Sequence, residues 1–134
     1  MVKYTVGVIS MISKEFCQEM QTVGMNVTEM VGHFMDSEQM FLKYLYKFFD
    51  AADGVVMELT TAAEKEDYPN MLFTAHSLKG LAGNIGLNGV FLPAKKMVDD
   101  IRADDFSDCA SYFQKIQENY YRAAAIVKKY RDEL

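Results

Sequence analysis

Apolar residues recur along most of this chain at alternating steps of three and four, a spacing that places them on one face of an α-helix. The longest such stripe predicts a helix over residues 38–63, with Ser37 as its N-cap and Glu38 near the positive end of the helix dipole. Its members are Phe41, Leu45, Phe48, Ala52, Val55 and Leu59. A second stripe predicts a last helix and consists of Cys109, Phe113, Ile116, Tyr120, Ala123 and Val127. Strands have little support.

Shorter stripes predict helical segments before the first long helix. Asn26, followed three residues later by Glu29, resembles a capping box and predicts a short helix that ends near Met35. Residues 16–23 suit one or two helical turns, which Gly24 would stop.

Two further helices are predicted between the long ones. The first covers residues 69–86, with Pro69 in the first turn, where its missing amide hydrogen costs nothing. The second runs from about residue 90 to residue 103, with an apolar stripe of Val90, Ala94, Met97 and Ile101. Pro93 would clash with a helix already formed at Gly89, so this helix either starts late or is kinked.

Short connections between these amphipathic segments predict an all-α fold, an antiparallel four-helix bundle with one or two extra N-terminal helical segments. The chain has no internal repeat, no low-complexity tract and no linker rich in Gly, Pro or Ser. We therefore expect a single domain over residues 1–134, with residues 1–23 as an N-terminal extension and residues 24–131 as the helical bundle.

Composition narrows the classes of function. The 134 residues include 19 Asp and Glu against 14 Lys and Arg, a net charge of −5, which disfavours nucleic-acid binding. No apolar stretch approaches the ~20 residues that span a bilayer, and Lys14 and Glu15 interrupt the short apolar run near the start, so we expect neither a signal peptide nor a membrane helix. Cys17 and Cys109 lie far apart and fit small core residues of a cytoplasmic protein better than a metal site or a disulfide framework.

The segment over residues 75–86 has features that core packing does not require. On a helical wheel, one side is formed by Met71, Thr74, Leu78, Ala82 and Ile85, which we predict to be buried. His76 points the opposite way, and the positions around it are Leu72, Phe73, Lys79, Gly80 and Gly83.

Each glycine inside a helix costs about 1 kcal/mol relative to alanine, so two beside one exposed histidine need a compensating benefit. Missing side chains at Gly80 and Gly83 would let a partner approach the imidazole closely, although they could instead allow close helix packing. An imidazole is a competent nucleophile near neutral pH, and the Lys79 ammonium would attract a phosphoryl group. Leu72 and Phe73, apolar and outward-facing, predict a docking patch.

The run His76-Ser77-Leu78-Lys79-Gly80, with Ala82, Asn84 and Gly86 after it, resembles the signature of histidine-containing phosphotransfer (HPt) domains of two-component phosphorelays. Val90, Ala94 and Met97 occupy the apolar positions of that family's next helix. The chain departs from the family at Val98, where an acidic residue is usual, at Pro93, and in its first 23 residues, which have no counterpart.

The resemblance implies a phosphocarrier in which His76 is the phosphoacceptor, Lys79 its charge partner and Gly80 the residue that clears space for an incoming receiver domain. The partners it implies are response-regulator receiver domains and a hybrid sensor histidine kinase, acting with a monomeric protein. No cofactor of its own is expected, since Mg²⁺ would be held by the receiver. The sequence has no P-loop and no glycine-rich nucleotide box, so it is not expected to be an enzyme by itself.

Two other functions remain open on the sequence. The first is an interaction scaffold that uses the Leu72 and Phe73 face, with His76 incidental. The second is a bundle that binds a metal ion or haem through His33 or His76, although His33 fits an ordinary helix-end residue better. The acidic group of Asp99, Asp100, Asp104 and Asp105 could suggest a cation site, but solvated carboxylates around a helix end are the preferred interpretation.

Overall fold

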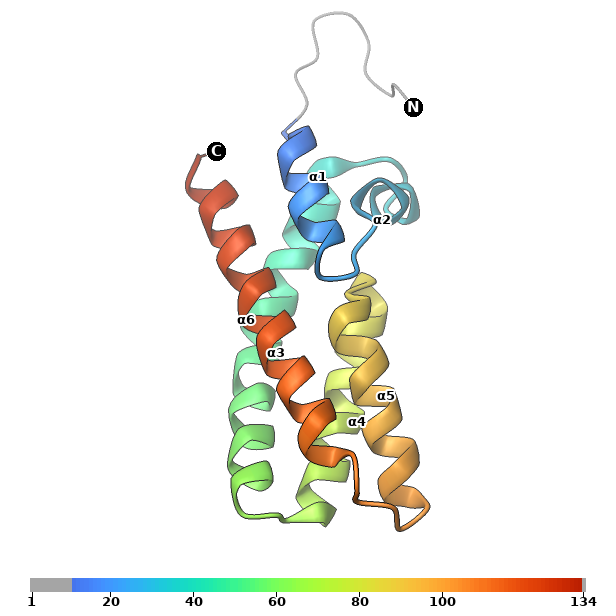
Figure 1. Ribbon diagram of the computed structural model, residues 1–134. Helices are drawn as coiled ribbons and strands as arrows, with labels where there is room; N and C mark the ends of the chain where they lie inside the picture. The colour runs from blue at the N-terminus through green and yellow to red at the C-terminus, as the bar shows by residue number, and fades with distance from the viewer. Residues whose placement is uncertain (1–10, 134) are drawn as a thin grey trace, which may run out of the picture.

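The computed structural model describes residues 11–133, which form six α-helices and no strand (Figure 1). In chain order they are α1 (Lys14–Gln21), α2 (Val27–His33), α3 (Glu38–Glu64), α4 (Tyr68–Ile85), α5 (Asn88–Arg102) and α6 (Cys109–Glu133). The predicted all-α class is confirmed. No helix in this part of the chain is both long enough and apolar enough to cross a membrane.

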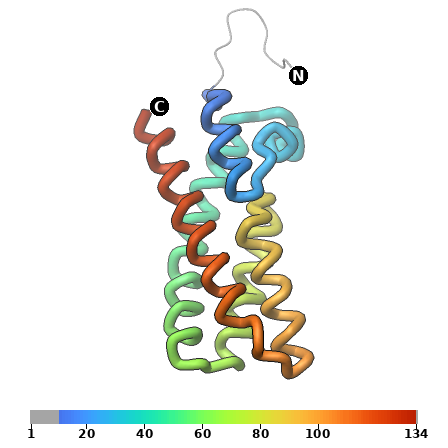
Figure 2. Tube along the Cα trace, in the orientation of Figure 1, coloured from blue at the N-terminus to red at the C-terminus, as the bar shows by residue number. Residues whose placement is uncertain are grey.

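Helices α3 to α6 form the four-helix bundle, each running antiparallel to the next along the chain (Figures 1 and 2). The two short helices α1 and α2 lie at the end of the bundle where α3 begins and α6 ends. The predicted architecture, a four-helix bundle with one or two extra N-terminal helical segments, is therefore confirmed, and there are two such segments.

Local signals set the helix ends as predicted. The Ser37 hydroxyl accepts a hydrogen bond from the Met40 amide at 3.1 Å, and the Asn26 side chain caps α2 in the same way. Asp67 caps α4, which places Pro69 in its first turn, and Gly86 ends that helix with a left-handed φ of 72°.

Helix α5 shows how the fold accommodates Pro93. The helix begins at Asn88, five residues before the proline, so of the two predicted alternatives, a late start or a kink, the late start is wrong. A proline cannot donate to the carbonyl of the residue four positions earlier, here Gly89. The Asn119 side-chain amide of α6 donates to that carbonyl at 2.8 Å instead, so no backbone acceptor is left without a partner there.

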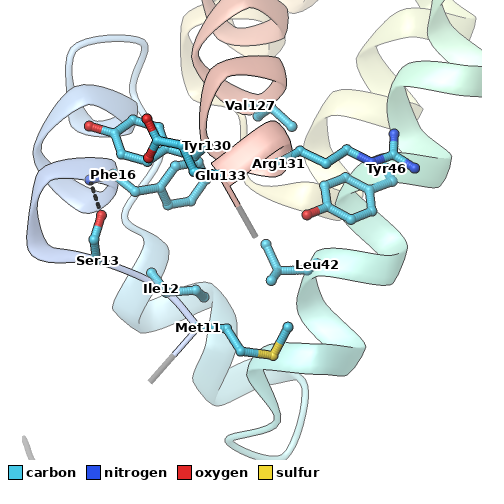
Figure 3. A pocket seen from close by; sticks show the side chains of 10 residues that line it. All are labelled: Met11, Ile12, Ser13, Phe16, Leu42, Tyr46, Val127, Tyr130, Arg131 and Glu133. Carbon is cyan, nitrogen blue, oxygen red and sulfur yellow. Dashed lines mark hydrogen bonds between the residues drawn. The ribbon is translucent and has the colours of Figure 1, made fainter. Parts of the chain in front are cut away.

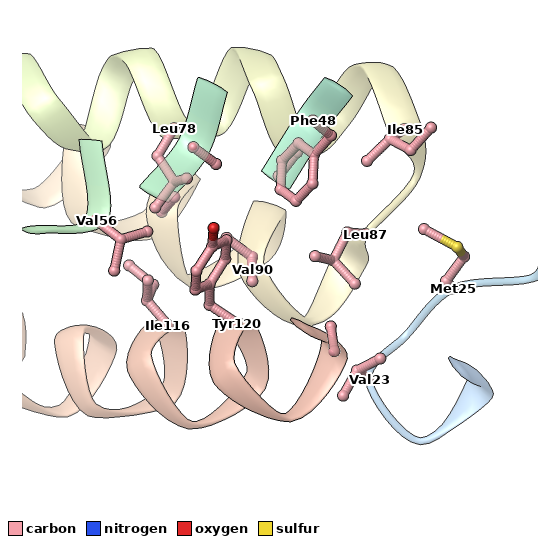
Figure 4. Close-up of a cluster of buried hydrophobic side chains, with 14 of the residues drawn as sticks. Val23, Met25, Phe48, Val56, Leu78, Ile85, Leu87, Val90, Ile116 and Tyr120 are labelled. Atoms are coloured by element: carbon pink, nitrogen blue, oxygen red, sulfur yellow. The ribbon is translucent and has the colours of Figure 1, made fainter. Parts of the chain in front are cut away.

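The apolar stripes of the four long helices meet along the bundle axis, as Figure 4 shows for the part around Tyr120. The predicted stripes are buried with small differences: Val56 rather than Val55 is fully buried in α3, and Phe113 is half-buried in α6. Tyr120 is fully buried, and its hydroxyl donates a hydrogen bond to the Asp53 carboxylate of α3. Asp53 is exposed, so this part-buried bond links α6 to α3 at the edge of the apolar core.

The two cysteines are reduced and separate. Cys109 is buried in the core stripe of α6 as predicted, whereas Cys17 on α1 is half-buried. Burial raises the pKa of both thiols, which lowers the fraction of reactive thiolate at neutral pH.

The described part of the N-terminal extension packs on the bundle. The Gly89 amide donates to the Val23 carbonyl at 2.9 Å, and the Lys129 ammonium pairs with Glu19 at 2.8 Å. Residues 1–10 of the extension lie outside the described residues. An apolar pocket of about 150 Å³ is lined by residues of α1, α3 and α6, with Arg131 stacked on Tyr46 at one side (Figure 3).

Candidate functional site

His76 lies near the middle of α4 with its side chain exposed to solvent. The opposite side of the helix is buried as predicted, and its buried residues are Met71, Thr74, Ala75, Leu78, Ala82 and Ile85. Because a helix turns by about 100° per residue, burial of this stripe directs position 76 outward. The condition on which the phosphocarrier interpretation rests, an imidazole in contact with solvent, is met.

The two glycines beside His76 differ in what surrounds them. A Cβ built on Gly80 would meet no atom within 4 Å, so the surface one turn from the imidazole is open. A Cβ on Gly83 would lie 3.1 Å from Cδ1 of Phe91, on α5. The open space predicted for a partner is therefore found at Gly80, whereas Gly83 allows close packing of α4 against α5, and its predicted contact with a partner stays a prediction.

The two apolar residues of the predicted docking patch differ in their exposure to solvent. Phe73 is 70% exposed, whereas Leu72 is half-buried against the core. Phe73 lines an open groove between α3 and α4 together with Met57, which is 66% exposed. Met57 is not among the site residues predicted from the sequence, although its position outside the apolar stripe of α3 is a signal that could have indicated it.

Lys79 is half-buried one turn after His76, on the side of α4 that faces α5. On α5, the Lys95 ammonium donates a hydrogen bond to the Asp99 carboxylate at 3.0 Å. That hydrogen bond, together with the positive charges of Lys79 and Arg102, lowers the pKa of Asp99. The charge of Lys79 on α4 thus acts on Asp99 of α5, so a carboxylate and several cations lie along the boundary between these two helices.

Most of the acidic residues considered as a cation site bond to neighbouring side chains, and together they do not form the geometry of a metal site. Asp99 bonds Lys95, Asp100 accepts from the Tyr112 hydroxyl at 3.1 Å, and Asp105 accepts from Ser107. Within residues 11–133, no three His, Cys, Asp or Glu side chains gather in a way that could hold a metal ion.

His33 is the last residue of α2 and is exposed. Asp104 lies in the turn after α5 and is exposed too. The structure gives neither residue a role in the surface around His76.

A comparison with models of known protein families shows to which family this chain belongs. The family model described as "Hpt domain" matches residues 43–126, more than half of the chain. The chain belongs to the HPt domain family. The match begins in α3 and ends in α6, so it includes His76 and most of the bundle but neither α1 nor α2, which lie before it. No curated protein and no solved structure matches the chain.

HPt domains carry phosphoryl groups on histidine in phosphorelays and interact there with response-regulator receivers and with kinases. An HPt domain is a phosphotransfer carrier and not a kinase module. Membership of the HPt family therefore relates the exposed imidazole of α4 to histidine phosphotransfer, which the geometry alone does not indicate.

Proposed function

We propose that this protein is a phosphocarrier of a multistep phosphorelay, in which His76 accepts a phosphoryl group from an aspartate of one receiver domain and donates it to another. The observation that carries the proposal is the exposed imidazole beside the open surface at Gly80. A receiver must bring its phosphoaspartate within bonding distance of the ring, and a side chain at position 80 would obstruct that approach.

The transfer is a displacement at phosphorus. The unprotonated ring nitrogen of His76 attacks, a nitrogen–phosphorus bond forms, and the phosphorus–oxygen bond to the receiver aspartate breaks. The aspartate carboxylate leaves with the electron pair and the second ring nitrogen of His76 keeps its hydrogen, so the displacement itself neither takes up nor releases a proton. The receiver supplies the acyl phosphate and the Mg²⁺ that neutralises its charge.

The protein's own residues supply position and charge. Helix α4 fixes the imidazole, because six of its residues are buried on the opposite side. Within residues 11–133, Lys79 forms no close ion pair of its own, so its ammonium group can interact with the phosphoryl oxygens. Phe73 offers an exposed apolar contact for the receiver surface. We further propose that the protein acts in the cytoplasm as a monomer, with a hybrid sensor histidine kinase upstream.

The decisive experiment mixes the protein with a receiver domain carrying a radiolabelled phosphoaspartate. We expect an acid-labile, alkali-stable label on the wild-type protein and none on His76→Gln. His33→Gln is the matched control, because it removes the other exposed histidine and should leave labelling unchanged. Absence of label on the wild type, or label retained by His76→Gln, would refute the proposal.

One observation favours a second candidate, an interaction scaffold: Phe73 and Met57 expose apolar surface along one groove whether or not His76 reacts. A scaffold would bind its partner equally well with His76→Gln and would carry no label. Substitution of Phe73 by serine would weaken binding under either function, so the labelling experiment separates the two.

A further inference from the structure

The boundary between α4 and α5 beside His76 holds a negative charge that the proposed chemistry does not need. Asp99 extends from α5 into solvent, bonded to Lys95, and a phosphoryl group on His76 would add a second anion to the same surface. A carboxylate next to a site that must bind a dianion opposes that binding by electrostatic repulsion. Its presence there therefore calls for an explanation.

The helix packing fixes where Asp99 lies. Gly83 of α4 packs against Phe91 of α5, which sets the register of two antiparallel helices. One turn back along α4 is Lys79, and one turn forward along α5 is Lys95, so these two lie across from each other. A further turn in each direction brings His76 and Asp99 to the same level of the boundary.

The charges at this level form one interacting group. The Lys95 ammonium lies 3.0 Å from the Asp99 carboxylate, and both side chains are about half exposed. Lys79 and Arg102 also act on Asp99 through their charges. One cation thus contacts the carboxylate and two others act on it through their charges, and each of the three is attracted by any anion placed nearby.

We propose that Asp99 sets the free energy of the phosphorylated state: it attracts the Lys79 and Lys95 ammonium groups when His76 is free, and it repels the phosphoryl group when His76 is phosphorylated. The inference rests on the proposed phosphocarrier function. Its consequence is a phosphohistidine that is less stable than the cations alone would make it, and hence a better donor to the next receiver. Asp99 is a positioning residue, since it acts through the charges around the reacting atoms.

The test measures the equilibrium between phosphorylated receiver plus free carrier and free receiver plus phosphorylated carrier. This equilibrium depends only on the free proteins, so changes in docking affinity do not affect it. Asp99→Asn should shift it roughly three- to tenfold toward phosphorylated carrier at low salt. Asp99→Lys should shift it further in the same direction, and Asp99→Glu should restore the wild-type value.

Salt provides an independent readout. The Debye length falls from about 10 Å at 0.1 M salt to about 3 Å at 1 M, so the Asp99→Asn shift should largely disappear at 1 M. A shift caused by altered packing would persist. The matched control is Asp132→Asn, because Asp132 forms the same type of exposed pair with Lys128 at 3.1 Å on α6.

Each outcome decides the inference. An unshifted equilibrium for Asp99→Asn and Asp99→Lys, or an equal shift for Asp132→Asn, would overturn it while leaving the proposed function in place. A wild-type protein that takes no label from any phosphorylated receiver would instead refute the function itself. Thermal unfolding of each variant, expected to be close to that of the wild type because the positions are exposed, checks that the fold is unchanged.

Discussion

Substitutions at Gly80 should affect helix stability and access to His76 in opposite directions, so the two effects can be measured separately. A Cβ at this position meets no atom within 4 Å, so Gly80→Ala introduces no clash. Alanine is favoured over glycine inside a helix by about 0.5–1 kcal/mol. The variant should therefore be more stable than the wild type, with a melting temperature higher by roughly 2–6 °C for a domain of this size.

Phosphotransfer should change in the opposite direction. The added methyl group stands one turn from His76, where the receiver has to approach, and Gly80→Gln places a longer side chain there. We expect Gly80→Ala to slow transfer by a small factor and Gly80→Gln to slow it at least about tenfold, equivalent to ~1.4 kcal/mol in the barrier. Rapid-quench measurement of transfer from a phosphorylated receiver gives these rates.

Gly54 of α3 is the matched control. It too is exposed, and a Cβ there meets no atom within 4 Å, so Gly54→Ala should raise stability by a similar amount without slowing transfer. Wild-type transfer rates in Gly80→Gln would contradict the steric argument. An equal slowing in Gly54→Ala would show that helix stability, and not access to His76, limits the rate.

Two further substitutions test the fold. Tyr120→Phe should lower the free energy of unfolding by about 1–2 kcal/mol in denaturant titrations, because it removes the part-buried hydrogen bond from the Tyr120 hydroxyl to the Asp53 carboxylate. The exposed neighbour Tyr121→Phe should change little, and equal effects would contradict this reasoning. Gly89→Ala should destabilise the protein by about 1–3 kcal/mol, since its Cβ would overlap with the Val23 carbonyl oxygen. An unchanged melting temperature would show that the N-terminal segment is not packed as described.

The elements of the fold could be predicted because their signals are local. Helix periodicity and capping residues act over one to four positions, so Ser37, Asn26 and Gly86 marked real helix ends. The outward direction of His76 followed from the same rule, since burial of one stripe leaves the opposite side of a helix in solvent. Pro93 misled the prediction because its compensating donor, Asn119, lies on another helix.

The sequence by itself therefore determined the helices, their buried stripes and the presentation of His76, and the HPt motif needed no more than that. Only the tertiary structure decided what lies beside the imidazole. Gly80 and Gly83 are equivalent on a helical wheel, yet Phe91 covers one and nothing covers the other. Asp99 reaches the neighbourhood of Lys79 through the register of two packed helices, which depends on contacts among residues far apart in the chain and leaves no periodic signal along it.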